Sequence, residues 1–284
     1  EIYRDLVRHH PDSWRGYMSI ADGTPDEAER LNALSASADL LTRIHAEAPS
    51  RQILFACINA RINLREAGRA LDELREAIGK DSGLFPRCDV GRESDVERAF
   101  GEVVEWLDGA PLECLVNNAG IANPYAGKLE DLALGDWQKW IDASLTAAFL
   151  VTRAALPLLR RAENASVTNI SSTRAVMSEA DTFAYAAAKG GLDALTHSLA
   201  VSLGPAIRVN AIRPGWIETG PWQKSSDRSH PDHRPQDRKQ HPAGRIGRPE
   251  DIAEAVAYLH TAGFVTGQHL NIDGGMTVKM IYEH

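Results

Sequence analysis

The segment 112–120, LECLVNNAG, is an apolar run that ends abruptly in a polar turn containing glycine. Similar runs recur along the chain as ASVTNISS at 165–172, IRVNAIRPG at 207–215 and GQHLNIDGG at 267–275. Helical patterns separate them, for example at 136–162 and 185–203. Buried strands that alternate with helices at this spacing indicate βαβ units around a parallel sheet. The expected fold class is α/β, a doubly wound and mostly parallel sheet with helices on both faces.

The rest of the chain divides into two regions around this pattern. Residues 51–284 form the expected α/β domain, with further strands predicted at 51–58 (RQILFACI) and 83–90 (GLFPRCDV). Residues 1–50 form an atypical, mostly helical segment that contains no clear apolar strand. A polar stretch at about 218–244 has no strong period, which is typical of a lid loop. His230, His233 and His241 lie in it, and their irregular spacing favours a solvated loop over a metal site.

Composition excludes several function classes. The chain has 284 residues and a net charge of −8, so a nucleic-acid partner, which favours a basic surface, is not expected. No apolar run approaches the roughly 20 residues that span a bilayer, so no membrane partner is expected. The start of the chain has no apolar signal-peptide core. Cys57, Cys88 and Cys114 are odd in number and scattered, which indicates a reduced, cytoplasmic protein.

A tyrosine and a lysine carry the clearest chemical signal. Tyr185 and Lys189 stand in FAYAAAKGG, and a separation of four residues places both on one helix face. A nearby lysine cation favours the phenolate, so it could bring the tyrosine pKa toward neutrality. Ser172, at the end of the strand 165–172, could bind a substrate carbonyl beside them. Taken alone, such a pair is more typical of a core tyrosine with a solvated lysine.

Other strand-end motifs accompany this pair. They are DV at 89–90, NNAG at 117–120, RPGWIETG at 213–220 and DGG at 273–275. In this order the motifs resemble those of the short-chain dehydrogenase/reductase family, from about residue 66 to the end of the chain. The C-terminal stretches GRIGRPEDIAEAVAYL and FVTGQHLNIDGGMT are similar to that family almost throughout. The resemblance implies a Rossmann-like fold and hydride transfer between a nicotinamide cofactor, NAD or NADP, and a small ketone or secondary alcohol.

The resemblance also implies roles for single residues. Tyr185 would be the general acid/base, Lys189 would lower its pKa and hold the nicotinamide ribose, and Ser172 would orient the substrate. The residues expected to border the cofactor are Asp89, Val90, Asn118, Ala119, Gly120, Pro214, Gly215, Ile217 and Thr219. Arg174 could meet an acidic substrate, although a surface ion pair is the simpler expectation. The apolar helices 136–162 and 185–203 suggest a homo-oligomer, and the resemblance points to a tetramer.

The chain departs from the family at its first βα unit. The family has TGxxxGxG after its first strand, where glycines let the backbone approach the pyrophosphate. The corresponding stretch here, RLNALSASADLL at 30–41, contains no glycine. If 51–58 is the second strand, the glycine positions fall on Asn32, Ala36 and Ala38. Cys57 then ends that strand, where an acid would favour NAD, so the preference between NAD and NADP stays open.

Ser144, in IDASLTAAF, is a second departure, because the family usually has asparagine there. That asparagine lies in a helix bend and holds a proton-relay water, so Ser144 is a further catalytic candidate with an expected slower relay. Packing alone would also explain a small residue here. Two functions therefore remain open. One is a dehydrogenase that uses Tyr185 as acid/base. The other is a protein of this fold that has lost dinucleotide binding, either a non-redox enzyme or a silent partner subunit.

Overall fold

A computed structural model describes residues 53–54, 84, 86–220, 229 and 232–280. The chain divides into two units, and every described residue belongs to the unit formed by 53–71 and 84–284. The predicted helical segment 1–50, the glycine positions at 32, 36 and 38, and Cys57 lie outside the described residues.

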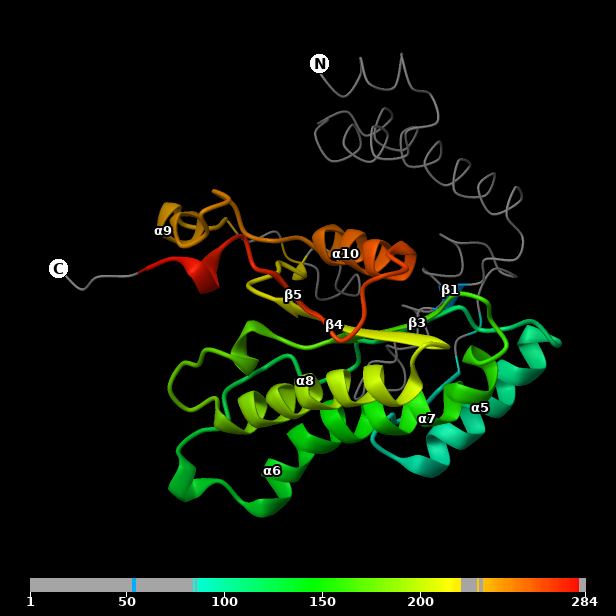
Figure 1. Cartoon of the computed structure of the whole chain (residues 1–284). Coiled ribbons are helices and arrows are strands. Elements are labelled where there is room, and N and C mark those ends of the chain that lie inside the picture. Colours follow the sequence, from blue (N-terminus) through cyan, green and yellow to red (C-terminus); the bar gives the residue numbers. More distant parts are fainter. Residues whose placement is uncertain (1–52, 55–83, 85, 221–228, 230–231, 281–284) are drawn as a thin grey trace, which may run out of the picture. The chain divides into compact units, whose positions relative to one another are not determined.

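The described part is built on a five-stranded sheet in which all neighbouring strands are parallel. The strands are β1 (Ile53–Leu54), β2 (Cys114–Asn117), β3 (Ala165–Ile170), β4 (Ile207–Pro214) and β5 (His269–Ile272). They lie side by side in chain order (Figure 1). All six residues of β3 are buried. Even its polar members, Ser166, Thr168 and Asn169, are buried, because a parallel sheet is covered on both faces.

Helices cover both faces of the sheet, as the alternating pattern predicts. On one face lie α5 (Glu93–Leu107), α7 (Ala147–Leu159) and α8 (Phe183–Leu203), and α10 (Pro249–Thr261) lies on the other (Figure 1). Two apolar cores result, one between the sheet and α5 and α7, the other between the sheet and α10. The remaining helical segments are α6 (Leu134–Ile141), the π-helical turn Asp142–Thr146, α9 (Pro235–Lys239) and the short turns Leu129–Asp131, Thr173–Ala175 and Met276–Val278.

The position of β1 corrects the strand assignment made from the sequence, which took 51–58 as the second strand of the fold. Ile53 and Leu54 pair with Cys114 and Leu115 of β2. In a doubly wound sheet of order 3-2-1-4-5-6, the strand that ends in the NNAG turn is the fourth, and its outer neighbour is the first strand. Ile53–Leu54 therefore occupies the place of the first strand, not the second. The phosphate-binding turn of this fold should follow Leu54, where the sequence FACINARIN at 55–63 again contains no glycine.

Two other expectations need revision. The strand predicted at 83–90 does not form in its described residues, Leu84 and 86–90. Pro86 contributes to this, because proline has no backbone N–H to donate to a neighbouring strand. The helical segment Leu134–Leu159 is long and apolar enough to cross a membrane, contrary to the expectation that no segment would be. Half of its apolar window is buried, and Leu150 and Val151 belong to the core beside α5.

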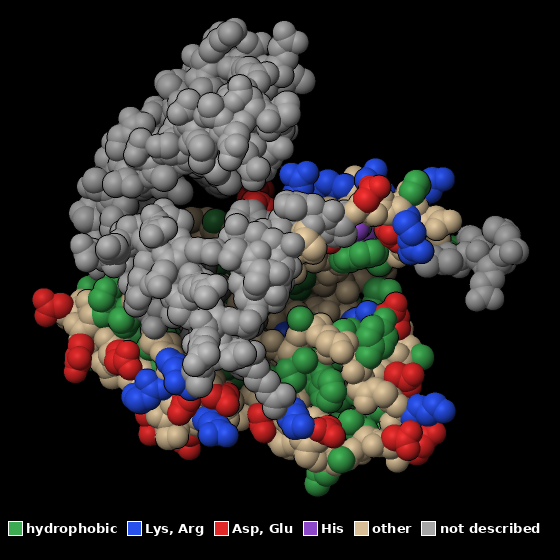
Figure 2. Space-filling view, turned by 180° about the vertical axis from the view of Figure 1, so that it is seen from behind, with side chains coloured by type: hydrophobic (Ala, Val, Ile, Leu, Met, Phe, Trp, Pro, Cys, Tyr) green, Lys and Arg blue, Asp and Glu red, His purple; other side chains and the backbone are tan. Residues whose placement is uncertain are grey.

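The surface mixes both signs of charge. Figure 2 shows acidic and basic side chains interspersed over the lower part of the described surface in that view, and several Lys and Arg side chains close together at its upper right.

Candidate active site

The carboxyl ends of the parallel strands share one edge, and the predicted catalytic side chains meet there. Ser172 follows β3, and Tyr185 and Lys189 lie on α8. The Lys189 ammonium reaches back to β3 and donates to the Ile170 carbonyl oxygen at 2.8 Å. Its Nζ lies 5.7 Å from the centre of the Tyr185 ring. A hydrogen bond with Ser172 favours the ionised form of Tyr185. The structure thus brings Ser172, Tyr185 and Lys189 together.

Burial dominates the electrostatics of this group. Lys189 is buried, and desolvation lowers its pKa to about 8, although the nearby Asp193 carboxylate opposes the change. Burial raises the pKa of Tyr185 above its ordinary value, while Ser172 and the Arg174 charge lower it. In the chain by itself the pKa of Tyr185 is therefore raised, because desolvation outweighs the favourable neighbours. The role of Lys189 in lowering this pKa stays a prediction.

Ser144 lies in a π-helical turn, Asp142–Thr146, between α6 and α7. Such single turns occur often at functional sites. The Ser144 hydroxyl is buried and has no hydrogen-bond partner within the described part of the chain. A Cβ at Gly120 would lie 3.3 Å from the Ser144 Oγ and 3.7 Å from the Lys189 Nζ. Gly120 thus leaves open the space between Ser144 and Lys189.

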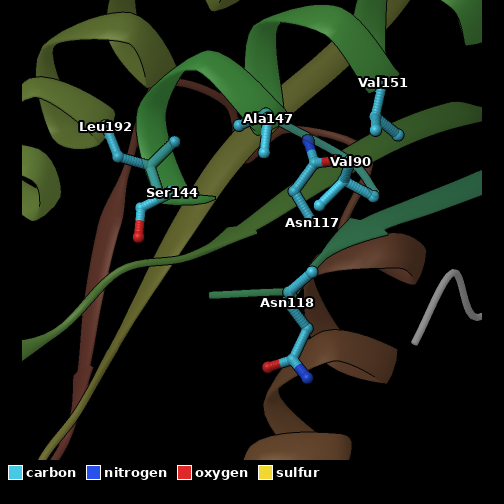
Figure 3. A pocket seen from close by; sticks show the side chains of 9 residues that line it. Val90, Asn117, Asn118, Ser144, Ala147, Val151 and Leu192 are labelled. Carbon is cyan, nitrogen blue, oxygen red and sulfur yellow. The ribbon is translucent and has the colours of Figure 1, made fainter. Parts of the chain in front are cut away.

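A pocket of about 20 Å³ opens beside Ser144, which is enough for one water molecule. Its lining residues are Val90, Asn117, Asn118, Ala119, Ser144, Ala147, Ala148, Val151 and Leu192. In Figure 3, Asn117 and Val90 lie beside α7, and the Asn118 side chain points away to the opposite side. Three of the predicted cofactor residues, Val90, Asn118 and Ala119, therefore share this pocket with Ser144.

Sequence reasoning missed the network behind this pocket. The Asn117 side-chain amide donates to Thr152 Oγ1 at 2.9 Å and to Asn169 Oδ1 at 2.8 Å. Asn169 in turn donates to Thr196 Oγ1 at 2.9 Å. These bonds tie β2, β3, α7 and α8 together directly behind the site. The available signal was a pair of asparagines inside otherwise apolar strands, since buried amides need partners.

The turns after β4 and β5 interlock. A Cβ at Gly215 would lie 2.7 Å from the Asp273 Cβ, so only glycine permits this close approach. Asp273 accepts hydrogen bonds from the Gly275 and Thr277 amides and so holds the DGG turn. Ile217 pairs with Gly247 and lines a separate hollow of about 310 Å³. Pro214 ends β4, and Thr219 follows in the same turn region. Asp89 lies in an exposed turn, where its side chain accepts from the Gly91 amide.

The lid histidines are not solvated as predicted. His233 Nε2 lies 3.0 Å from the Glu218 carboxylate, and its ring packs edge-on against Trp216. His241 is buried, and its Nδ1 lies 3.0 Å from the Asp237 carbonyl oxygen. Tertiary packing on Trp216 and on the turn after β5 orders these residues, which local composition cannot reveal. His230 lies outside the described residues, and among those described no three potential ligands are grouped for a metal.

The edge suits a nicotinamide cofactor. Lys189 uses one ammonium donor on Ile170, which leaves two for ribose hydroxyls. Gly120 keeps the approach to Lys189 clear, and the Ser144 hydroxyl adds a buried polar group without a partner in the described chain. A parallel sheet with these groups at its carboxyl edge defines a dinucleotide-dependent oxidoreductase.

Comparison with known proteins gives the family. Residues 55–277 match the family described as enoyl-(acyl carrier protein) reductase. An oxidoreductase of Thermotoga maritima with uncharacterised activity is 42% identical over 237 residues, covering 81% of this chain and 91% of the relative. Trans-4-hydroxycyclohexanecarboxylate dehydrogenase of Sinomonas cyclohexanicum is 34% identical, covering 88% of this chain and 93% of the relative. An apo SCOR enzyme from Clostridium thermocellum superposes with a TM-score of 0.67 at 28% identity, covering 86% and 89% of the two chains.

The chain belongs to the short-chain dehydrogenase/reductase family. It is an oxidoreductase, as its relatives are, and family members act on alcohols and ketones with NAD(P). The alternative of a protein that has lost dinucleotide binding is not favoured.

Proposed function

We propose that the chain catalyses reversible hydride transfer between NAD or NADP and a small ketone or secondary alcohol, with Tyr185 as the acid/base. The observation that carries the proposal is the convergence of Ser172, Tyr185 and the buried Lys189 at one strand edge. A bound nicotinamide cofactor would supply or accept the hydride. During ketone reduction the Ser172 hydroxyl donates to the carbonyl oxygen and orients it. The Tyr185 hydroxyl then gives its proton to that oxygen.

The remaining residues support this proton transfer. Lys189 would hold the ribose and stabilise the tyrosinate left behind. Ser144 would hold a water in the adjoining pocket, through which Tyr185 could regain its proton by way of Lys189. Val90, Asn118, Ala119 and Gly120 would border the cofactor on one side. Pro214, Gly215, Ile217 and Thr219 would border it on the other, and Asp89 would lie near the adenine.

A ring-bearing alcohol or ketone is our first choice of substrate. The relative named trans-4-hydroxycyclohexanecarboxylate dehydrogenase spans nearly the whole chain, and its name specifies a secondary alcohol on a six-membered ring. Substituted cyclohexanones are therefore suitable first substrates.

The test begins with titration of the wild-type protein with NADH and with NADPH, followed by nicotinamide fluorescence. Micromolar binding of either supports the proposal and decides the preference. Oxidation of that cofactor by cyclohexanones is then followed at 340 nm for the wild type and for Tyr185→Phe. We expect Tyr185→Phe to bind the cofactor equally and to lose roughly 10²- to 10⁴-fold in kcat, the usual contribution of acid–base catalysis. No binding of either cofactor at millimolar concentration would refute the proposal.

We further propose a cytoplasmic homotetramer. The exposed apolar side chains Phe149 on α7 and Val201 on α8 support helix-mediated association. Cys88 and Cys114 are buried and free, which is consistent with a reducing compartment. Sedimentation equilibrium should give four times the 31.0 kDa chain mass, and a monomer would contradict the assembly. Fractionation of the source cells would test the location.

A further inference from the structure

Two loops beyond the strand ends join next to Ser172. One follows β2 and contains Tyr125, and the other lies between Ser172 and α8 and contains Glu179. The Ala126 amide donates to the Asp181 carbonyl oxygen at 2.8 Å. The Tyr125 hydroxyl donates to Glu179 Oε2 at 2.9 Å. The two loops are therefore fixed to each other by a backbone and a side-chain bond.

Arg174 connects this junction to the catalytic serine. Its backbone amide donates to Ser172 Oγ at 3.1 Å. Its guanidinium forms an ion pair with Glu179, as the sequence favoured, and lies 5.7 Å from the centre of the Tyr125 ring. The Arg174 side chain is 23% exposed and that of Glu179 is 60% exposed. The arginine charge is thus the better shielded of the two, so solvent screens it less from its neighbours.

The positive charge of Arg174 favours the ionised form of Tyr185. Together with the Ser172 hydrogen bond, it lowers the pKa of Tyr185 against the rise caused by burial. The cations facing Tyr185 are Lys189 from α8 and Arg174 from the turn after β3. Glu179 is the acid paired with Arg174, and hydrogen bonds from Arg174 and Tyr125 hold its pKa below the usual range. Glu179 is therefore ionised at neutral pH and partly offsets the arginine charge.

We propose that Arg174 is a positioning residue that holds a positive charge beside the Tyr185–Ser172 pair, and that Glu179 sets how much of this charge Tyr185 experiences. Tyr125 fixes the geometry from the opposite loop. The consequence for catalysis depends on the proposed role of Tyr185 as acid/base. The electrostatic coupling does not depend on it.

Direct titration of Tyr185 tests the coupling without any enzymatic reaction. Tyrosinate absorbance is measured against pH for each variant with and without Tyr185→Phe, and the difference isolates Tyr185 from the other tyrosines. Arg174→Gln should raise the midpoint by about 0.5 to 1 pH unit, because it removes a partly compensated neighbouring cation. Glu179→Gln should lower the midpoint, because the arginine charge is then unopposed. Arg174→Lys keeps the charge and should stay near the wild type.

A matched pair on α7 and α5 provides the control. Arg153 also forms an ion pair with an acid, Glu93, and its guanidinium lies 5.2 Å from the centre of the Phe149 ring. Arg153→Gln and Glu93→Gln should leave the Tyr185 midpoint unchanged. The proposal is overturned if Arg174→Gln and Arg174→Lys shift the midpoint equally, or if Glu179→Gln shifts it in the same direction as Arg174→Gln. Either result would mean that the cluster acts only by holding the loops.

The pH profile of kcat for alcohol oxidation then extends the test to catalysis. Its acidic limb should move up for Arg174→Gln and down for Glu179→Gln, in step with the optical midpoints. Optical shifts in a wild-type protein that transfers no hydride would refute the proposed function and leave the role of Arg174 intact. Hydride transfer with unchanged optical midpoints in the variants would support the proposed function and refute the role of Arg174.

Discussion

A buried cation lies near each end of the parallel strands, at the amino edge and at the carboxyl edge of the sheet, and the two cations differ in how many hydrogen bonds they donate to the chain. At the amino edge, Arg208 of β4 is 9% exposed and donates to four oxygens, those of Leu259, His260, Ala262 and Asn164. At the carboxyl edge, Lys189 is 5% exposed and has one oxygen acceptor among the described residues, Ile170. The guanidinium of Arg208 donates four hydrogen bonds to oxygens of the chain, whereas the ammonium of Lys189 donates one among the described residues.

The difference indicates that Arg208 contributes to the stability of the fold, whereas Lys189 is available for chemistry at the other end of the strands. The four acceptors offset the desolvation of Arg208, and three of them are carbonyls at the C-terminal end of α10, where intrahelical N–H donors run out. Lys189 is less well compensated, and its pKa falls to about 8. A buried group that keeps unused hydrogen-bond donors and a shifted pKa can bind a ligand or transfer a proton.

The largest expected effect comes from removing the cation at the carboxyl edge. Lys189→Met should lower kcat by about 10²-fold or more, because the proposed ribose contact and the charge near Tyr185 are lost together. The variant should still fold. Steady-state kinetics at saturating cofactor measure the loss. Lys139→Met, which removes an exposed lysine paired with Asp136, is the control and should keep wild-type kcat. A kcat within threefold of wild type for Lys189→Met would contradict a chemical role for this edge.

Removing the other cation should affect folding alone. Arg208→Met should lower the free energy of unfolding by about 3 to 5 kcal/mol, because four oxygens around the end of α10 lose the hydrogen bonds donated by the guanidinium. Urea denaturation measures the change, and kcat at low temperature should persist. Arg238→Met is the surface control, with an expected change below about 1 kcal/mol since its ion pair with Asp232 is exposed. Equal changes in the two variants would show that the amino-edge network is not structural.

The pH dependence of stability should reveal the burial of Lys189. Its folded pKa of about 8 lies below the ordinary value of 10.5. Between these pH values the unfolded chain binds the extra proton, so wild-type stability should rise with pH. Relative to Lys189→Met, the wild type should be at most about 3 kcal/mol less stable below pH 8, with the gap closing by pH 10.5. Urea midpoints from pH 7 to 10.5 measure the gap. A constant gap would mean that Lys189 is not desolvated.

The smallest effect concerns Ser144. Ser144→Ala removes the buried hydroxyl that we propose holds a water in the adjoining pocket, so the free energy of unfolding should change by less than about 1 kcal/mol. The kcat should fall about tenfold, less than the roughly 10²- to 10⁴-fold typical of a direct general acid or base, because Ser144 acts only through the water. Thr168→Val is the matched control, because the Thr168 hydroxyl is also buried, has no partner among the described residues and lies inside β3. It should leave kcat unchanged. An unchanged kcat in Ser144→Ala would leave only packing to explain the serine.

Much of the fold and site follows from local sequence. The apolar runs ending at Asn117, Ile170 and Ile272 predicted the strands, since a buried parallel strand is nearly continuous in apolar residues. The spacing of Tyr185 and Lys189 predicted a shared helix face because both lie on one helix. These features depend on residues close together in the chain.

The parts that were missed depend on distant residues. No local pattern reveals that Ile53–Leu54 pairs with β2 and so takes the place of the first strand. The pKa of Lys189 follows from burial beneath the strand ends, and the placement of His241 follows from packing by the turn after β5. Arg174 and Glu179 are near neighbours in sequence, but the loop from β2 that fixes them through Tyr125 is 54 residues away.

The order in which the ribosome supplies these contacts differs between the two edges. Ser172, Tyr185 and Lys189 emerge within one short stretch, directly after β3 and on the next helix. Arg208 must wait for carbonyls that lie 51 to 54 residues further along the chain. We therefore expect a nascent chain to bring Ser172, Tyr185 and Lys189 together before Arg208 can form its hydrogen bonds at the amino edge. Synthesis halted before α10 would leave a preformed site on an unfinished sheet.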